Sequence, residues 1–170
     1  MSRNLKGGEV IRNCTLNDIS TIEEIINEAA VAYRGVIPAD CWHEPYMSRA
    51  ELGSELAAGV VFSGWEAEHG LVGVMGLQQV RDATLIRHAY VRPAQQGRGI
   101  GGALLDELIG RSTGPLLVGT WAAATWAIRL YEKHGFRLTS ESEKDRLLDT
   151  YWNIADRQRE TSVVLVHETL

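Results

Sequence analysis

The segment from Val91 to Gly102 (VRPAQQGRGIGG) constrains this chain more than any other, because it leads from a strand-like run into a helix-like run through four closely spaced glycines. Glycine allows positive φ angles and leaves no side chain to keep a ligand away from the main chain. The first N–H groups of the following helix have no partners within it, and the helix dipole makes them attractive to phosphate. We predict a phosphorylated ligand over residues 96–102. A glycine-rich turn required only for tight packing is the alternative.

The same glycines also satisfy the pattern G-x-G-x-x-G of dinucleotide-binding folds, at Gly97, Gly99 and Gly102. Such a fold requires an acidic residue about 20 positions later to hold the ribose. Thr120 and Trp121 occupy that place instead. The Lys-Ser/Thr signature of a P-loop is missing as well. A nicotinamide oxidoreductase is therefore the least favoured enzyme class.

The spacing of apolar residues predicts the elements around this segment. Two capping boxes, Thr15 with Asp18 and Ser48 with Glu51, each predict the start of a helix. The predicted class is α+β, with one mixed, mostly antiparallel sheet of about seven strands and about four helices. The polar stretch 141–160 is expected to be partly helical. The strands are expected at 9–14, 60–67, 71–80, 83–91, 116–121, 136–140 and 161–167, and the helices at 15–33, 48–59, 99–113 and 124–134.

Composition excludes several classes of function. A length of 170 residues suits one domain, which we place over residues 1–170. Seventeen Lys and Arg against 22 Asp and Glu give a formal net charge of −5, which does not suit a nucleic-acid partner. The longest apolar run, Leu71–Leu77, is too short to span a membrane or to form a signal peptide. Cys14 and Cys41 lack metal-ligand spacing, so we expect no metal and a reducing, cytoplasmic location.

The glycine-rich loop is the first of two motifs. It reads Gln96-x-x-Gly99-x-Gly101 and follows a strand that ends in Tyr90-Val91. The second motif is the later run 127–136, Ala-Ile-Arg-Leu-Tyr-Glu-Lys-His-Gly-Phe. In this order the two motifs resemble those of the GNAT superfamily of N-acetyltransferases, and the resemblance covers nearly the whole chain. It implies a GNAT-like single domain with a splay between the fourth and fifth strands.

The resemblance also implies acetyl-CoA as the cosubstrate. The loop amides would cradle its pyrophosphate, and its pantetheine arm would lie where the strands 83–91 and 116–121 splay apart. Asparagine is common in the family at the position of Ala124, so Thr125 is either its substitute or a helix cap. The residues expected to bind the cofactor are Ala89, Tyr90, Val91, Gln96, Gly97, Arg98, Gly99, Ile100, Gly101, Gly102, Ala124 and Thr125.

Transfer of an acetyl group from a thioester to an amine needs an unprotonated amine, a partner for the carbonyl oxygen and a proton for the leaving thiolate. The resemblance places the general acid at Tyr131, whose alternative role is that of a core tyrosine. A main-chain N–H near Tyr90 or Val91 would meet the oxygen, because the strand splays there.

The sequence leaves the general base open among three residues. An imidazole titrates near neutrality, which favours His88, but the alternation of faces along a strand puts this side chain opposite Arg87 and Ala89. Glu44 and Glu66 are the carboxylate candidates, with ordinary solvated side chains as the alternative. A chain of water molecules in place of a single base also stays open.

Aromatic residues in the loop after the first helix, and in the connection before the last strand, are expected to bind the acceptor, because their π faces attract a cationic amine. Their alternative role is to close the end of the sheet. The predicted reaction is direct attack by the amine of a small molecule or peptide in a ternary complex. A CoA-binding sensor without turnover, and a homodimer of the chain, stay open. The expected acceptor residues are Tyr33, Trp42, His43, Tyr46 and Trp152.

Overall fold

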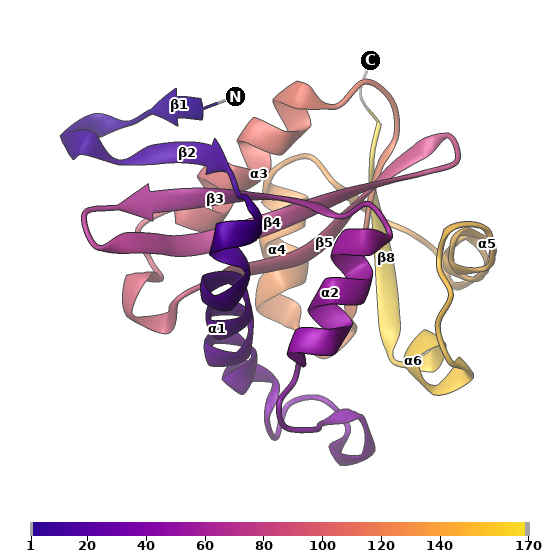
Figure 1. The fold of residues 1–170 in the computed structure, drawn as a ribbon. Helices are drawn as coiled ribbons and strands as arrows, with labels where there is room; N and C mark the ends of the chain where they lie inside the picture. Colours follow the sequence, from indigo (N-terminus) through magenta and orange to yellow (C-terminus); the bar gives the residue numbers. More distant parts are fainter. Residues whose placement is uncertain (1, 169–170) are drawn as a thin grey trace.

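The structure of the protein is a computed structural model that describes residues 2–168. Within them, one eight-stranded sheet has the order β1-β2-β3-β4-β5-β6-β8-β7 (Figure 1). Every neighbouring pair in this order is antiparallel except β5 and β6, which are parallel. The strands are β1 (Ser2–Asn4), β2 (Val10–Asn13), β3 (Val61–Ala67), β4 (Gly70–Val80), β5 (Ala83–Val91), β6 (Leu116–Trp121), β7 (Arg137–Leu138) and β8 (Ser162–His167).

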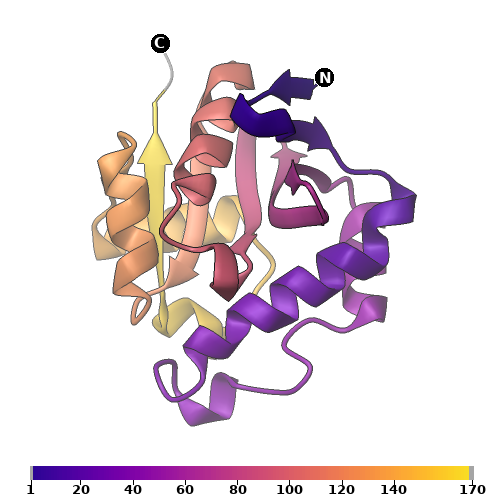
Figure 2. The same cartoon turned by 90° about the vertical axis from the view of Figure 1, so that its left-hand side faces the viewer.

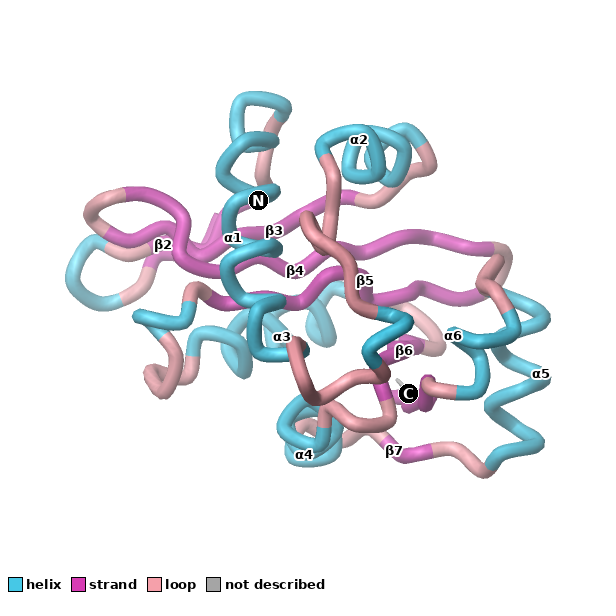
Figure 3. The backbone as a smooth tube through the Cα atoms, turned by 90° about the horizontal axis from the view of Figure 1, so that it is seen from below, coloured by secondary structure: helices cyan, strands magenta, loops and turns pink. Residues whose placement is uncertain are grey.

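Helices cover both faces of the sheet. Figure 1 shows α1 and α2 in front of the strands and α3 and α4 behind them, while α5 and α6 lie at the opposite end from β1 and β2 (Figure 3). The two ends of the described chain lie on the same side of the molecule (Figure 2). The helices are α1 (Ile19–Ala30), α2 (Arg49–Ala57), α3 (Ile100–Arg111), α4 (Thr125–Lys133), α5 (Glu141–Tyr151) and α6 (Asp156–Glu160).

Apolar side chains fill both layers between helices and sheet. The larger core packs α3 and α4 against one face, and a second core packs α1 and α2 against the other. The apolar stripe of α1, with Ile22, Ile25 and Ile26 fully buried, is the one that the sequence predicts. No helix among residues 2–168 combines the length and the apolar character that crossing a bilayer requires.

The predicted α+β class with a mixed, mostly antiparallel sheet is confirmed, but the number of elements differs. The described chain has eight strands instead of about seven, because Ser2–Asn4 adds an edge strand too short to show a periodic pattern. It has six α-helices instead of about four, because the polar stretch forms α5 and α6. The side chain of Ser140 caps α5, and only one apolar side chain of this helix, Leu148, is buried, so periodicity gave little signal.

The sheet opens between its two parallel strands. Residues Thr84–Ile86 of β5 pair with Leu116–Val118 of β6, and beyond them the two strands separate. On its other edge β5 carries a β-bulge, because the pairing with β4 shifts by one residue between Val74 and Gly76. The extra residue lies at or beside His88, whose φ of +57° is rare for a residue other than glycine. The splay predicted from the family resemblance is therefore present.

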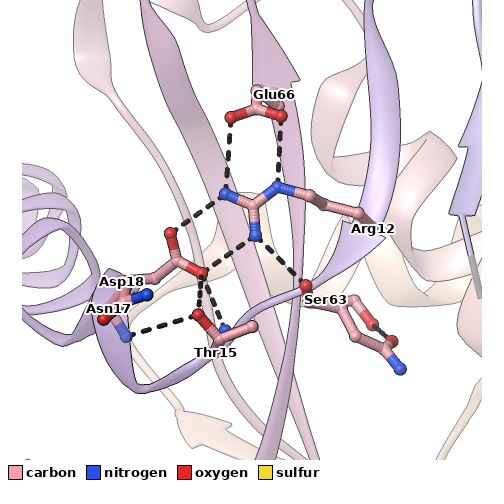
Figure 4. Close-up of polar contacts among 7 residues, drawn as sticks. Arg12, Thr15, Asn17, Asp18, Ser63 and Glu66 are labelled. Carbon is pink, nitrogen blue, oxygen red and sulfur yellow. Dashed lines mark hydrogen bonds and ion pairs between the residues drawn. The ribbon is translucent and has the colours of Figure 1, made fainter.

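A partly buried network of ion pairs connects the start of α1 to the sheet (Figure 4). Arg12 on β2 donates to both carboxylate oxygens of Asp18, at 2.9 and 3.0 Å, and its Nε donates to Glu66 on β3 at 3.1 Å. Asp18 also accepts from the backbone N–H of Thr15 at 2.7 Å, as the predicted capping box requires. The hydrogen bonds from Arg12 lead the causes that hold the pKa of Asp18 below its ordinary value.

We expect the variant Asp18→Asn to be less stable than the wild type by about 1 to 3 kcal/mol at pH 7, since it removes charge-assisted hydrogen bonds and weakens a cap. An aspartate whose pKa is depressed stabilises the fold while it is ionised, and this contribution is lost as the pH falls. The gap between the two proteins in urea denaturation should therefore narrow below about pH 4. A gap that stays constant from pH 7 to pH 3 would contradict this account of the network.

Candidate active site

A cavity of about 470 Å³ fills the opening between β5 and β6. The end of α1, the start of α3 and the first turns of α4 form its remaining walls. Most of the residues predicted to bind the cofactor line this cavity. The predicted cofactor residues that line it are Ala89, Tyr90, Val91, Gln96, Gly97, Gly99, Ile100, Gly101 and Gly102.

Two positions of the loop before α3 have positive φ angles, which favour glycine. Gly97 and Gly99 have φ angles of +83° and +79°, and a Cβ added to either would meet no atom within 4 Å. Ile100, Gly101 and Gly102, in the first turn of α3, line the cavity, so the N–H groups of this turn lie beside it, as a phosphate cradle requires. The side chain of Gln96 braces the loop by donating to the carbonyl oxygen of Val91 at 3.2 Å.

Gly102 is glycine for a different reason. A Cβ at this position would lie 2.9 Å from Nε2 of His134, which comes from α4. The ring is fixed there, because its Nδ1 is 2.6 Å from a carboxylate oxygen of Asp106 on α3. Gly102 therefore lets α3 and α4 pack closely, in addition to lining the cavity.

Three predicted cofactor residues do not line the cavity. The guanidinium of Arg98 turns away from it and bonds to Glu9 at 2.9 Å and to Gln95 at 2.6 Å. Ala124 is fully buried in the core, and Thr125 is exposed as the first residue of α4. Thr125 is not the helix cap, since Ala124 holds that position without a side-chain hydrogen bond. The aromatic ring of Trp126, which sequence reasoning missed, lines the cavity instead.

Tyr131 belongs both to the core and to the wall of the cavity, which are the settings of its two predicted roles, core tyrosine and general acid. Its ring belongs to the larger core and lies 5.5 Å from the ring of Phe136, and the residue is only 4% exposed. It nevertheless lines the cavity. Burial, with a smaller contribution from Tyr33, raises the pKa of Tyr131 well above its ordinary value, so the phenol keeps its proton.

A second cavity of about 140 Å³ adjoins the first through the same opening in the sheet. Its outer wall comes from the C-terminal connection, which supplies Leu148, Trp152, Ile154 and Gln158. Because the two cavities share part of their walls, ligands bound in them would meet between β5 and β6. The residues that line both are Tyr33, Ile86, His88, Tyr90, Gly119 and Thr120.

Aromatic rings from three parts of the chain meet at the second cavity. The ring centre of Tyr33 lies 5.4 Å from that of Tyr46 and 6.3 Å from that of Tyr90. The indole N–H of Trp121 donates to the hydroxyl of Tyr46 at 2.8 Å. Burial raises the pKa of Tyr46 to about 12, so this hydroxyl is neutral at physiological pH. The cluster therefore presents rings and neutral hydroxyls to a ligand.

The predicted acceptor residues fall into two groups. Tyr33, Tyr46 and Trp152 line the second cavity, with Trp152 packed over Gly119 of β6. Trp42 and His43 do not line it, but their rings lie 5.8 and 6.0 Å from that of Tyr46. Trp42 and His43 therefore pack behind Tyr46, outside the wall of the second cavity.

Of the three candidate bases, only His88 lies at the cavities. Glu66 is held by Arg12 in the network described above and lines neither cavity. Glu44 is 64% exposed in its loop, 3.6 Å from Arg34, and also lines neither. The structure thus does not bring the two carboxylate candidates to the site.

The predicted orientation of His88 needs correction. Strict alternation would place it opposite Arg87, but both side chains contact Glu55 on α2. The bulge is the physical reason, because an extra residue turns the pleat and re-aims the side chain. Sequence reasoning missed Glu55, which has no motif around it.

Comparison with known proteins agrees with this geometry. Residues 60–138, which run from β3 to β7, match the model of the acetyltransferase (GNAT) domain. This chain carries a GNAT acetyltransferase domain. The matched region of this GNAT domain contains the glycine-rich loop, both splayed strands and Tyr131. No curated protein matches the sequence closely enough to count as a relative.

Solved structures of similar fold cover almost the whole chain. The PaiA N-acetyltransferase of Thermoplasma acidophilum, solved with coenzyme A, is 18% identical with a TM-score of 0.70, over 95% of this chain and 99% of that one. A GNAT-family acetyltransferase of Staphylococcus aureus Mu50 is 17% identical with a TM-score of 0.70, over 94% and 98%. The ribosomal-protein-S18-alanine N-acetyltransferase of Escherichia coli is 19% identical with a TM-score of 0.64, over 94% and 93%. At these identities the likeness shows a shared fold.

The predicted phosphate-binding role of the glycine-rich loop can be tested at Gly99. We expect Gly99→Asp to weaken the binding of coenzyme A by about 100-fold or more, because it places a negative charge beside the pyrophosphate. Gly99→Asn is the matched control, since asparagine has the same shape and tolerates a positive φ well. It should bind more tightly than Gly99→Asp in isothermal titration calorimetry. Binding of both variants with wild-type affinity would show that the ligand lies elsewhere.

Proposed function

We propose that this protein is an N-acetyltransferase that transfers the acetyl group of acetyl-CoA to a primary amine by direct attack in a ternary complex. One observation carries the proposal: two cavities of different character meet between β5 and β6, with His88 and Tyr90 in the shared wall. The larger cavity ends at the phosphate-binding loop and suits the cofactor. The smaller one suits the amine, and the arrangement lets both be bound at once.

The residues of the larger cavity fit acetyl-CoA, which supplies an activated thioester when bound. The N–H groups at the start of α3 suit its pyrophosphate, and the open φ-positive glycines leave room for it. The part of β5 beyond Ile86 has no β6 partner, so its edge is free to pair with the amides of the pantetheine arm. Tyr90 and Val91 belong to that part of β5, and a main-chain N–H near one of them is predicted to stabilise the carbonyl oxygen.

Tyr131 and His88 are proposed to handle the two protons of the reaction. A C–N bond forms and the C–S bond breaks, while His88 accepts a proton from the amine and Tyr131 gives one to the sulfur. The high pKa of Tyr131 keeps it protonated until the thiolate forms. Exchange with solvent then restores both side chains.

The smaller cavity favours an amine with a single positive charge. The described residues that line it include Arg87 and His88 but no aspartate or glutamate. Glu55 balances Arg87 at 3.2 Å, so little negative charge is left to attract a second ammonium group. The C-terminal connection also closes over this side, where Arg157 of α6 forms two hydrogen bonds to Asp40, at 2.9 and 3.1 Å. A small amine fits this enclosure better than a folded protein.

The proposed function is tested by assaying thiol release from acetyl-CoA with a library of primary amines. Acetylated amine, identified by mass spectrometry, is the expected product. Tight binding of acetyl-CoA without release of thiol above the background with any amine would identify a CoA-binding sensor instead.

We expect Tyr131→Phe to lower kcat by about 10- to 1,000-fold, which is near the usual contribution of general acid catalysis. The affinity for coenzyme A should change little, because phenylalanine fills the same space in the core. Steady-state kinetics with calorimetry separates these effects. If turnover at saturating amine is unchanged, the hydroxyl is structural and another group protonates the thiolate.

We also expect 1-aminobutane to be a better acceptor than 1,4-diaminobutane, by about tenfold in kcat/KM, because the second ammonium would face Arg87 without a free carboxylate. Arg87→Gln should reduce this ratio, and comparing the two amines within one variant removes any general loss of activity. A wild-type preference for the diamine would contradict the single-charge assignment.

A further inference from the structure

Glu55 of α2 contacts the bulge in β5 through both of its carboxylate oxygens. Its Oε2 is hydrogen-bonded to Nε2 of His88, and its Oε1 accepts from Nη2 of Arg87 at 3.2 Å. The contact joins two elements that are 33 positions apart in sequence. Arg87 is itself anchored, since its Nη1 donates to Gln78 of β4 at 3.0 Å.

The pair is shielded from solvent. The side chain of His88 is 14% exposed and that of Glu55 is 23% exposed. The ring of Phe62, from β3, stacks against the imidazole with ring centres 6.1 Å apart. Burial by itself would raise the pKa of Glu55, but the hydrogen bond from His88 and the charges of His88 and Arg87 outweigh it and leave the pKa below its ordinary value. The carboxylate is therefore ionised beside the ring.

An ionised carboxylate can only accept hydrogen bonds, so it fixes the proton of a neutral imidazole on the nitrogen that it contacts. Here that nitrogen is Nε2, which leaves the lone pair on Nδ1. No residue among 2–168 makes a hydrogen bond to His88 Nδ1, and the ring lines both cavities. Nδ1 of His88 therefore carries a lone pair that no other described residue uses as a hydrogen-bond acceptor.

The backbone of His88 is strained in a way that supports this contact. A φ of +57° for a residue other than glycine persists only where the surroundings enforce it, and such strain concentrates at functional sites. Glu55 and Arg87 supply that restraint, because together they hold the bulge against α2.

We infer that Glu55 is the positioning residue for His88: it fixes the imidazole at the junction of the two cavities in the tautomer whose Nδ1 accepts the proton of the amine. The inference rests on the proposed function, since it assumes that the amine attacks at this junction. During the step the amine proton moves to Nδ1, the Nε2 proton stays in the hydrogen bond to Glu55, and the carboxylate balances the imidazolium charge. No other reactant is needed.

The test compares Glu55→Gln with Glu51→Gln in the full chain. A glutamine at position 55 keeps the shape, but its amide can also donate to Nε2 and so favour the wrong tautomer. We expect kcat to fall by about 10- to 100-fold with the affinity for coenzyme A within about twofold of the wild type. Glu51 lies one turn earlier on α2 and is exposed, so its variant should match the wild type.

Nitrogen NMR of the imidazole supplies a second readout that does not depend on turnover. In the wild type, the neutral His88 ring should carry its proton on Nε2, and Glu55→Gln should increase the share with the proton on Nδ1. Assignment uses the signal that is lost in His88→Gln. A wild-type ring protonated on Nδ1 overturns the inference, whether or not the variant folds.

The kinetic outcomes separate the two claims. A wild type that turns over while Glu55→Gln equals it in kcat overturns the positioning role alone. A wild type that releases no thiol with any amine overturns the proposed function, and the positioning role falls with it.

Discussion

The early separation of β5 from β6 is the constraint on which the rest of the site depends. Backbone groups in a sheet normally satisfy one another, and an unpaired stretch is costly unless another partner takes its place. Here the two strands pair over three positions and then diverge, which leaves one edge of β5 free inside the protein. Both cavities open from that gap. The helix that follows β5 brings its N-terminal amides to one end of the gap, and the aromatic cluster closes the other.

The bulge in β5 completes this arrangement, because it sends two successive side chains toward the same face. Arg87 and His88 both reach Glu55, while Ala89 and Val91 pack into the core on the opposite face. A regular strand would have aimed His88 into that core, and no imidazole would then line the described walls of the two cavities. The strained φ of His88 is thus linked to the only described imidazole that lines either cavity.

Local chemistry made much of this predictable from the sequence. The glycines at 97 and 99 adopt positive φ, and the side chains of Thr15 and Ser48 cap the starts of helices, because these features depend on residues only a few positions apart. The bulge and the partner of His88 depend on contacts between distant segments, and no periodic pattern reports them. The same limit explains Glu66, whose carboxylate accepts a hydrogen bond from Arg12 on the adjacent strand β2. Ala124 lies in the core, so the resemblance could not tell that the side chain lining the cavity at the start of α4 is that of Trp126.

The central claim is that acetyl-CoA lies along the free edge of β5 and delivers its thioester to the junction at His88. A crystal structure of the chain with coenzyme A tests it most directly. The account predicts the pyrophosphate on the N–H groups of residues 97–102, the pantetheine amides paired with β5 beyond Ile86, and the sulfur between His88 and Tyr131. Coenzyme A bound outside the gap, or with its sulfur away from both side chains, would contradict it.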